Sequence, residues 1–354
     1  MSAEKFDVVI IGGGNAGIGV TGPVRRVGLS VAMIEARDLG GTCPNRGCTP
    51  KKVLVAAGQA LHDIERAARH RIAVGKPKLD WAALIAREKD MIKDIPENLA
   101  RAMARREVEV IKGHGTFAGP DGVQVGDRTL HAGHIVIAAG SKPRPLPIPG
   151  AEHMVTSDEI LSESKRPESI VFIGGGVISL EFGHVYARAG SSVTILEALP
   201  QLLPAMDADA VAKLQAESVR IGLEISTGVR IERIEASGGR FRVIFTHEGT
   251  EKTVEAGSSM ARVVSSMSRA SRSPLARSIT TTAASLPTTI CAQPPIHASM
   301  SEAMSFQPRL SYRLSRLMKV ISSFAISLMD RSTARTTRAL RPRSTRFPRL
   351  PLSA

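Results

Sequence analysis

The chain has 354 residues, a formal charge of +14 and an isoelectric point near 10.2, values that would favour a nucleic-acid-binding protein if the charge were evenly spread. It is not, because residues 257–354 hold 15 Lys and Arg against two acids, whereas residues 1–256 hold 32 basic and 31 acidic residues. Of the 31 glycines, 30 precede Gly257 and none follows it. We therefore interpret residues 1–256 as a globular α/β protein and 257–354 as a basic, Ser/Arg-rich tail.

The first predicted strand, Phe6 to Ile11, is a short apolar run typical of a buried parallel strand. It leads into a glycine-rich turn that predicts a dinucleotide-binding helix start, in which successive glycines allow a tight turn, approach of a pyrophosphate and close helix packing. These glycines are Gly12, Gly14 and Gly17. A second strand, Ser30 to Ile34, ends at Glu35, whose carboxylate is placed to accept hydrogen bonds from a ribose.

Two cysteines separated by four residues, Cys43 and Cys48, follow directly and can close a small disulfide ring. The alternatives are a pair of buried thiols or half of a zinc site. No second Cys or His pair lies at metal-ligand spacing, so the sequence favours redox chemistry and predicts no metal site.

Residues 61–106 are predicted to be rich in helix and residues 108–136 rich in strand. An apolar strand then ends at the turn Ala138 to Pro143, and alternating prolines up to Pro149 predict a stiff connector. We place the boundary between two modules here, with residues 1–150 as the first and 151–256 as the second.

The nucleotide-binding pattern recurs in the second module. Strand Ser169 to Ile173 precedes a second glycine turn, and strand Ser192 to Leu196 ends at Glu197. The turn residues are Gly174, Gly176 and Ser179, the last in place of a third glycine. A carboxylate at this position repels the 2′-phosphate of NADP and favours the free hydroxyl of NAD, so NAD(H) is the predicted nucleotide.

The run Gly40-Gly41-Thr42-Cys43-Pro44-Asn45-Arg46-Gly47-Cys48-Thr49-Pro50-Lys51-Lys52 resembles the flavoprotein disulfide reductases, the family of dihydrolipoamide dehydrogenase, glutathione reductase and mercuric reductase. The resemblance covers Phe6 to about Ala256 and implies two Rossmann-like modules, binding FAD and then NAD(P). It implies Cys43 and Cys48 as the redox disulfide, with Lys52 beside the flavin and paired with Glu181. Further implied FAD contacts are Gly41, Thr42, Gly115, Ala139 and Gly140.

The implied activity is electron transfer between NAD(P)H, FAD and the Cys43–Cys48 disulfide, with a small disulfide or dithiol as substrate. Lipoamide, glutathione disulfide and a metal ion all fit as substrates. Cys48 would form a thiolate next to the flavin, with a pKa depressed by Lys52 and a nearby base, and Cys43 would exchange with substrate. The family is homodimeric, and neither a nucleic-acid nor a membrane partner is expected. The absence of a recognisable signal sequence favours a cytoplasmic protein.

The tail, residues 257–354, departs from the family pattern. The family continues beyond residue 256 with a strand, a flavin-binding Gly-Asp pair and a dimerisation domain, and none of these is recognisable here. We hypothesise a shift of reading frame near Ala256, which leaves a truncated FAD- and NAD-binding chain. The alternative to an active reductase is therefore a catalytically silent remnant. A disordered tail or a nucleic-acid arm are the other interpretations of residues 257–354, and its near lack of aromatic residues disfavours the arm.

Overall fold

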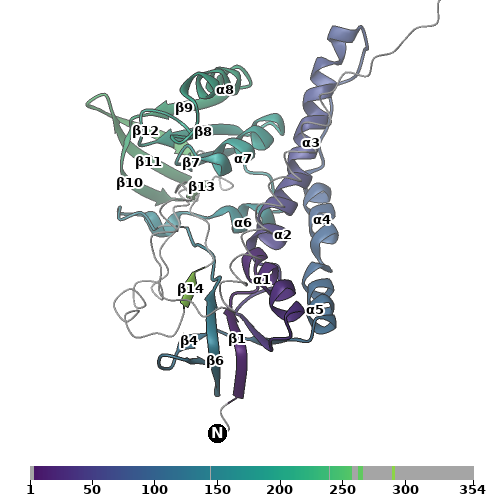
Figure 1. The fold of residues 1–354 in the computed structure, drawn as a ribbon. Helices are drawn as coiled ribbons and strands as arrows, with labels where there is room; N and C mark the ends of the chain where they lie inside the picture. The colour runs from purple at the N-terminus through teal and green to yellow at the C-terminus, as the bar shows by residue number, and fades with distance from the viewer. Residues whose placement is uncertain (1–3, 144, 239, 257–261, 266–288, 292–354) are drawn as a thin grey trace, which may run out of the picture.

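The structure is a computed structural model of the chain. It describes residues 4–143, 145–238, 240–256, 262–265 and 289–291. The backbone of these residues forms two units that share a helical interface, shown in Figure 1.

The first unit is built on a mixed sheet with strand order β3-β2-β1-β6-β5-β4. Its central strands are parallel, and β5 and β4 are added antiparallel beyond β6. Val8–Ile11 at the end of β1 are all buried, as a strand covered on both faces requires. The strand bounds are β1 Glu4–Ile11, β2 Val31–Glu35, β3 Val108–Lys112, β4 Thr116–Phe117, β5 Gly122–Val125 and β6 Arg128–Ile137.

Helices of the first unit lie beside this sheet and extend away from it toward the second unit (Figure 1). Their bounds are α1 Asn15–Arg26, α2 Thr42–Arg46, α3 Cys48–Arg66, the 3-10 turn η1 Ala67–His70, α4 Trp81–Ile92 and α5 Ile95–Arg105. The predicted helix-rich stretch of residues 61–106 and the strand-rich stretch of residues 108–136 are both confirmed.

The second unit combines a parallel sheet of order β13-β7-β8-β9 with an antiparallel meander β10-β11-β12. The strand bounds are β7 Ser169–Ile173, β8 Ser192–Glu197, β9 Leu223–Thr227, β10 Arg230–Ser237, β11 Arg240–His247, β12 Thr250–Ala256 and β13 Arg262–Ser265. Its helical segments are η2 Ala151–His153, α6 Ser157–Ser162, α7 Val177–Arg188 and α8 Ala208–Arg220.

Two short segments of the basic tail are strands. β13 pairs in parallel with β7, and β14, Thr289–Cys291, pairs in parallel with β6 of the first sheet. The strand that the family resemblance implies after residue 256 was not recognised in the sequence, but the structure contains a strand at residues 262–265, paired with β7. The remainder of the tail prediction, including the frame shift and disorder, lies outside the described residues.

Helices α3 and α4 of the first unit share one hydrophobic core with the second unit. Leu54 and Trp81 are buried together with Phe172 and Tyr186. The rings of Trp81 and Tyr186 are 4.9 Å apart, and the indole donates a hydrogen bond to the Glu163 carbonyl oxygen at 2.9 Å. Burial of such large aromatic surfaces stabilises the interface by several kcal/mol. The shared core thus fixes the two units relative to each other, and it fixes the two glycine turns with them.

No helix among the described residues is both long enough and apolar enough to cross a lipid bilayer.

Candidate functional site

The first glycine turn lies at the carboxyl end of β1, where two glycines are required by close contacts. A Cβ added to Gly12 would lie 2.2 Å from the Ala138 carbonyl oxygen, and one added to Gly17 would lie 1.9 Å from the Gly12 oxygen. Gly14 is the N-cap of α1 and provides no side-chain cap. Because Gly14 supplies no side-chain acceptor, the backbone N–H groups at this helix start are available to a phosphate.

The Glu35 carboxylate stands beside this turn at the end of β2. Its Oε2 accepts a hydrogen bond from the Gly13 amide at 2.7 Å, and its Oε1 accepts one from the Arg37 amide at 2.7 Å. These bonds fix the carboxylate in place, and each oxygen keeps a further lone pair for a ribose hydroxyl. The structure thus places the Glu35 carboxylate beside the first glycine turn, and its contact with a ribose stays a prediction.

Other residues implied for FAD lie at the same carboxyl end of the strands of the first sheet. Gly115 lies against Ile34 and Val123, and a Cβ there would be 3.2 Å and 3.3 Å from those side chains, which would have to give way by a few tenths of an ångström. The Ala138 amide donates to the Ile11 carbonyl oxygen at 2.8 Å, so Ala139 and Gly140 follow at the carboxyl end of β6, next to β1.

The loop that leads into the two cysteines packs against the first glycine turn. Gly41 has a left-handed φ of 65°, and a Cβ there would lie 2.8 Å from the Gly14 Cα. Thr42 then begins α2, and Cys48 begins α3 directly after Gly47. The sequence thereby places both cysteines near helix starts, in the segment that follows the contact between Gly41 and Gly14.

Cys43 and Cys48 are free thiols, half-buried and exposed respectively. A side-chain hydrogen bond with Cys43, reinforced by burial, raises the pKa of the Cys48 thiol, while the charges of Lys51 and Lys52 lower it to a smaller extent. The predicted depressed pKa of Cys48 is therefore wrong for this dithiol form, because the hydrogen bond to Cys43 favours the protonated Cys48 thiol. The two lysines act in the predicted direction.

The lysine that pairs with Glu181 is Lys51, not Lys52. Lys51 lies on the face of α3 that meets α7, three residues before the buried Leu54 and seven before Gly58, which contacts Val185. Lys52 lies about 100° further round the helix and is exposed. The predicted Lys52–Glu181 pair was wrong for this reason, although the ion pair between the redox helix and α7 is present.

The second glycine turn repeats the first almost residue for residue. The Glu197 Oε2 accepts a hydrogen bond from the Gly175 amide, and its Oε1 accepts one from the Leu199 amide at 2.8 Å. Gly174 has a φ of 104°, and Ser179 is buried with its hydroxyl donating to the Gly174 carbonyl oxygen. Ser179 is thus accommodated because its hydroxyl finds a partner within the turn.

Each glycine turn precedes a helix without a side-chain cap. The helices α4, α6 and α8 are capped by the side chains of Asp80, Thr156 and Asp207, whereas α2, α3 and α5 also lack such a cap. Gly14 and Gly176 leave the first amides of α1 and α7 without a side-chain acceptor. An anionic ligand supplies the missing acceptor, so the residues present fit a dinucleotide at each turn.

Val177 begins α7 at the second turn and is 50% exposed.

No cluster of His, Cys, Asp and Glu suited to a metal ion occurs within the described ranges.

The site combines two elements that sequence reasoning missed, the Lys51 pairing and an ion-pair cluster joining Arg46 to Asp158. A helical-wheel comparison of Lys51 with Leu54 and Gly58 would have indicated the first. No sequence signal indicates the second, because Arg46 and Asp158 are far apart in the chain.

Comparison with known proteins defines the class to which this fold and site belong. The family model of the pyridine nucleotide-disulphide oxidoreductases matches residues 6–264. The chain belongs to this family, and the match extends eight residues beyond Ala256 to include most of β13.

Particular relatives narrow the comparison. A dihydrolipoyl dehydrogenase of Synechocystis is 36% identical over 262 residues, covering 71% of this chain and 55% of that protein. One from Acholeplasma laidlawii is 29% identical, covering 72% of this chain and 76% of that protein. The solved copper(II) complex of the HOCl-induced flavoprotein disulfide reductase RclA from Escherichia coli is 26% identical, with a TM-score of 0.64, and it covers 75% of this chain and 57% of that one. The chain thus spans between about half and three quarters of the length of these relatives.

Proposed function

We propose that this chain is an FAD-dependent pyridine nucleotide–disulfide oxidoreductase of the dihydrolipoyl dehydrogenase type. The observation that carries the proposal is the seating of the cysteine loop on the first glycine turn, Gly41 against Gly14. A dithiol pair held at the pyrophosphate end of a dinucleotide site is suited to exchange electrons with a flavin. Family membership supports this chemistry.

Each residue has a role that follows from its place. The amides of the Gly12–Gly17 turn would hold the FAD pyrophosphate and Glu35 its ribose. FAD, when bound, supplies a two-electron acceptor that takes hydride from a nicotinamide. Cys43 and Cys48 hold the electrons as two thiols, releasing two protons and two electrons when their S–S bond forms. The Lys51 and Lys52 ammonium groups favour the Cys48 thiolate.

NAD(H) is the proposed nucleotide of the second module. Glu197 is buried and held by two backbone amides at the end of β8, so its charge faces the ribose position without freedom to turn away. The nearest arginine on α8, Arg220, is already paired with Glu217. A 2′-phosphate would therefore meet a fixed negative charge and no free arginine from that helix.

The proposed substrate is a small disulfide or dithiol, of which lipoamide is the first candidate because the curated relatives are dihydrolipoyl dehydrogenases. Glutathione disulfide and a metal ion are the alternatives. We also propose a cytoplasmic, homodimeric protein, since a thiol couple that turns over with NADH belongs in a reducing compartment.

The test is NADH-dependent reduction of lipoamide by the full chain loaded with FAD, compared with Cys43→Ser and Cys48→Ser variants. Turnover that both substitutions abolish supports the reductase. Absence of turnover, with or without bound flavin, would contradict the reductase and support the catalytically silent remnant. Parallel reactions with glutathione disulfide and mercuric ion separate the alternative substrates.

A further inference from the structure

The short helix that carries Cys43 lacks a buried apolar side chain. α2 spans five residues, Thr42–Arg46, and none of its side chains is buried. A single helical turn is not stable by itself in water, so its position depends on polar contacts. Those contacts are made by its last two residues, Asn45 and Arg46.

Asn45 fastens α2 to the loop that precedes it. Its Nδ2 donates to the carbonyl oxygens of Leu39 at 2.8 Å and Gly41 at 3.1 Å. These bonds are local, within six residues, and therefore shape the loop without fixing it to the rest of the protein.

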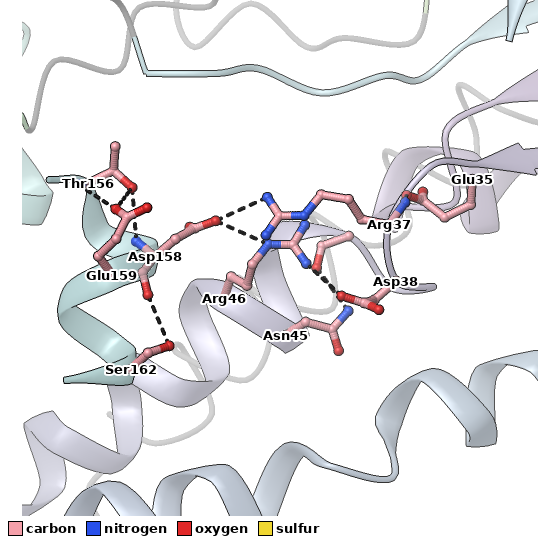
Figure 2. Close-up of polar contacts among 10 residues, drawn as sticks. Glu35, Arg37, Asp38, Asn45, Arg46, Thr156, Asp158, Glu159 and Ser162 are labelled. Atoms are coloured by element: carbon pink, nitrogen blue, oxygen red, sulfur yellow. Dashed lines mark hydrogen bonds and ion pairs between the residues drawn. The ribbon is translucent and has the colours of Figure 1, made fainter. Parts of the chain in front are cut away.

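Arg46 makes the long-range attachment, as Figure 2 shows. Its Nη1 lies 3.2 Å from the Asp38 Oδ2, and its Nε lies 3.4 Å from the Asp158 Oδ2. The Arg46 side chain is only 16% exposed, which strengthens both pairs relative to those on an open surface. Since Arg46 is three residues after Cys43 and two before Cys48, this attachment acts on the loop between the thiols.

Asp158 is a fixed point for that attachment. It lies in the first turn of α6, whose start is closed by reciprocal capping bonds between Thr156 and Glu159. The same helix buries Ile160 and Leu161 in the core shared by the two units. α6 therefore offers Arg46 a carboxylate whose backbone cannot easily move.

We propose that Arg46 is a positioning residue of the redox centre, which holds the Cys43–Cys48 loop in the geometry for disulfide closure through its ion pair with Asp158. The inference rests on the proposed function, because it assumes that the two thiols form the redox couple. Holding the thiols close raises their effective concentration and so favours the disulfide. The cationic charges that act on Cys48 belong to Lys51 and Lys52, so Arg46 acts through position.

Arg37 provides a matched control on the same carboxylate. Its Nη1 lies 3.2 Å from the Asp158 Oδ2, but Arg37 belongs to the segment after β2 and its side chain is 58% exposed. Removing Arg37 takes one partner from Asp158 and leaves the attachment of α2 intact.

The experiment equilibrates the full chain in mixtures of oxidised and reduced dithiothreitol and quantifies the Cys43–Cys48 disulfide by mass spectrometry. In each exchange the two thiols give two electrons and two protons to oxidised dithiothreitol, whose own S–S bond opens. Arg46→Met and Asp158→Asn are each expected to shift the equilibrium about threefold toward the dithiol, the size of effect that one partly exposed ion pair produces. The same two substitutions should also accelerate the alkylation of Cys43 in the reduced protein.

Arg37→Met should leave both readouts at their wild-type values, and the double variant Arg46→Met/Asp158→Asn should match Arg46→Met alone, because both changes remove one interaction. Unchanged equilibria in Arg46→Met and Asp158→Asn, with a disulfide still formed in the wild type, would overturn this inference and leave the proposed function standing. A merely structural role would lower the melting temperature without moving the thiol equilibrium. Failure of the wild type to form the disulfide at any mixture would overturn the redox role and this inference together.

Discussion

Lys51 on α3 forms an ion pair with Glu181 on α7, and this pair joins the helix that begins at Cys48 to the helix that begins at the second glycine turn. Lys51 is 18% and Glu181 36% exposed at the side chain. The two proposed cofactor sites are thus connected through one salt bridge beside the shared core.

Substituting the two adjacent lysines separates the structural from the electrostatic effect. Lys51→Met should lower the free energy of unfolding by up to about 1 kcal/mol because it breaks the inter-unit pair. Lys52→Met should change it by less than about 0.5 kcal/mol, since Lys52 is exposed. Both variants should raise the pKa of Cys48, because both charges lower it. Urea unfolding and thiol alkylation measure the two effects, and equal stability losses would contradict the assignment of Lys51.

Gly17 should be intolerant of a side chain, whereas Gly19 on the same helix should accept one. A Cβ at Gly17 would lie 1.9 Å from the Gly12 carbonyl oxygen, whereas one at Gly19 has no neighbour within 4 Å. Gly17→Ala should therefore destabilise the protein by more than about 2 kcal/mol through a backbone shift. Gly19→Ala should stabilise it by about 0.4–1 kcal/mol. Thermal melts check both, and a melt of Gly17→Ala at or above wild type would refute the close packing.

The pKa of Cys48 should lie above that of an ordinary thiol as long as its side chain is hydrogen-bonded to Cys43. Its hydrogen bond to Cys43 raises the pKa, so less thiolate is present at a given pH and alkylation of Cys48 should rise late as pH increases. Cys43→Ala removes that partner, and the midpoint of the rate–pH curve should move to lower pH. Cys43→Ser keeps an acceptor and should shift it less. A midpoint unmoved by alanine would show that Cys43 does not hold the proton.

Glu197 should determine the choice between nicotinamide nucleotides. Glu197→Gln keeps an oxygen for the Gly175 amide but removes the charge, so NADH binding should weaken about tenfold while NADPH binding improves. Glu224→Gln, an exposed carboxylate on the neighbouring strand β9, is the control and should alter neither affinity. Titrations of both nucleotides provide the measurement, and an unchanged NADH/NADPH ratio in Glu197→Gln would contradict the role of Glu197.

Local patterns carried most of the fold prediction. The apolar run ending at Ile11, the glycine turn after it and Glu35 twenty-two residues beyond Gly13 are encoded in contiguous sequence, and the structure contains each in the expected place. The same holds for Gly175 and Glu197.

Features set by tertiary packing were predictable only in part. Whether Lys51 or Lys52 meets Glu181 depends on the rotation of α3 against α7, which the cysteine motif does not specify but the helical spacing of Lys51, Leu54 and Gly58 indicates. The Arg46–Asp158 pair joins positions on different units, and the shared core of Trp81 and Tyr186 joins α4 to α7. β13 was not recognised because four residues are too few for a periodic pattern, and the strand is defined by its pairing with β7.

The central claim is that Cys43 and Cys48 form a redox couple in exchange with a bound flavin. Its most direct test is an anaerobic reductive titration of the FAD-loaded chain with dithionite. The account predicts that the wild type takes up twice as many electrons per flavin as the Cys43→Ser/Cys48→Ser variant, because flavin and disulfide each accept a pair. Equal electron uptake by the two proteins would contradict it.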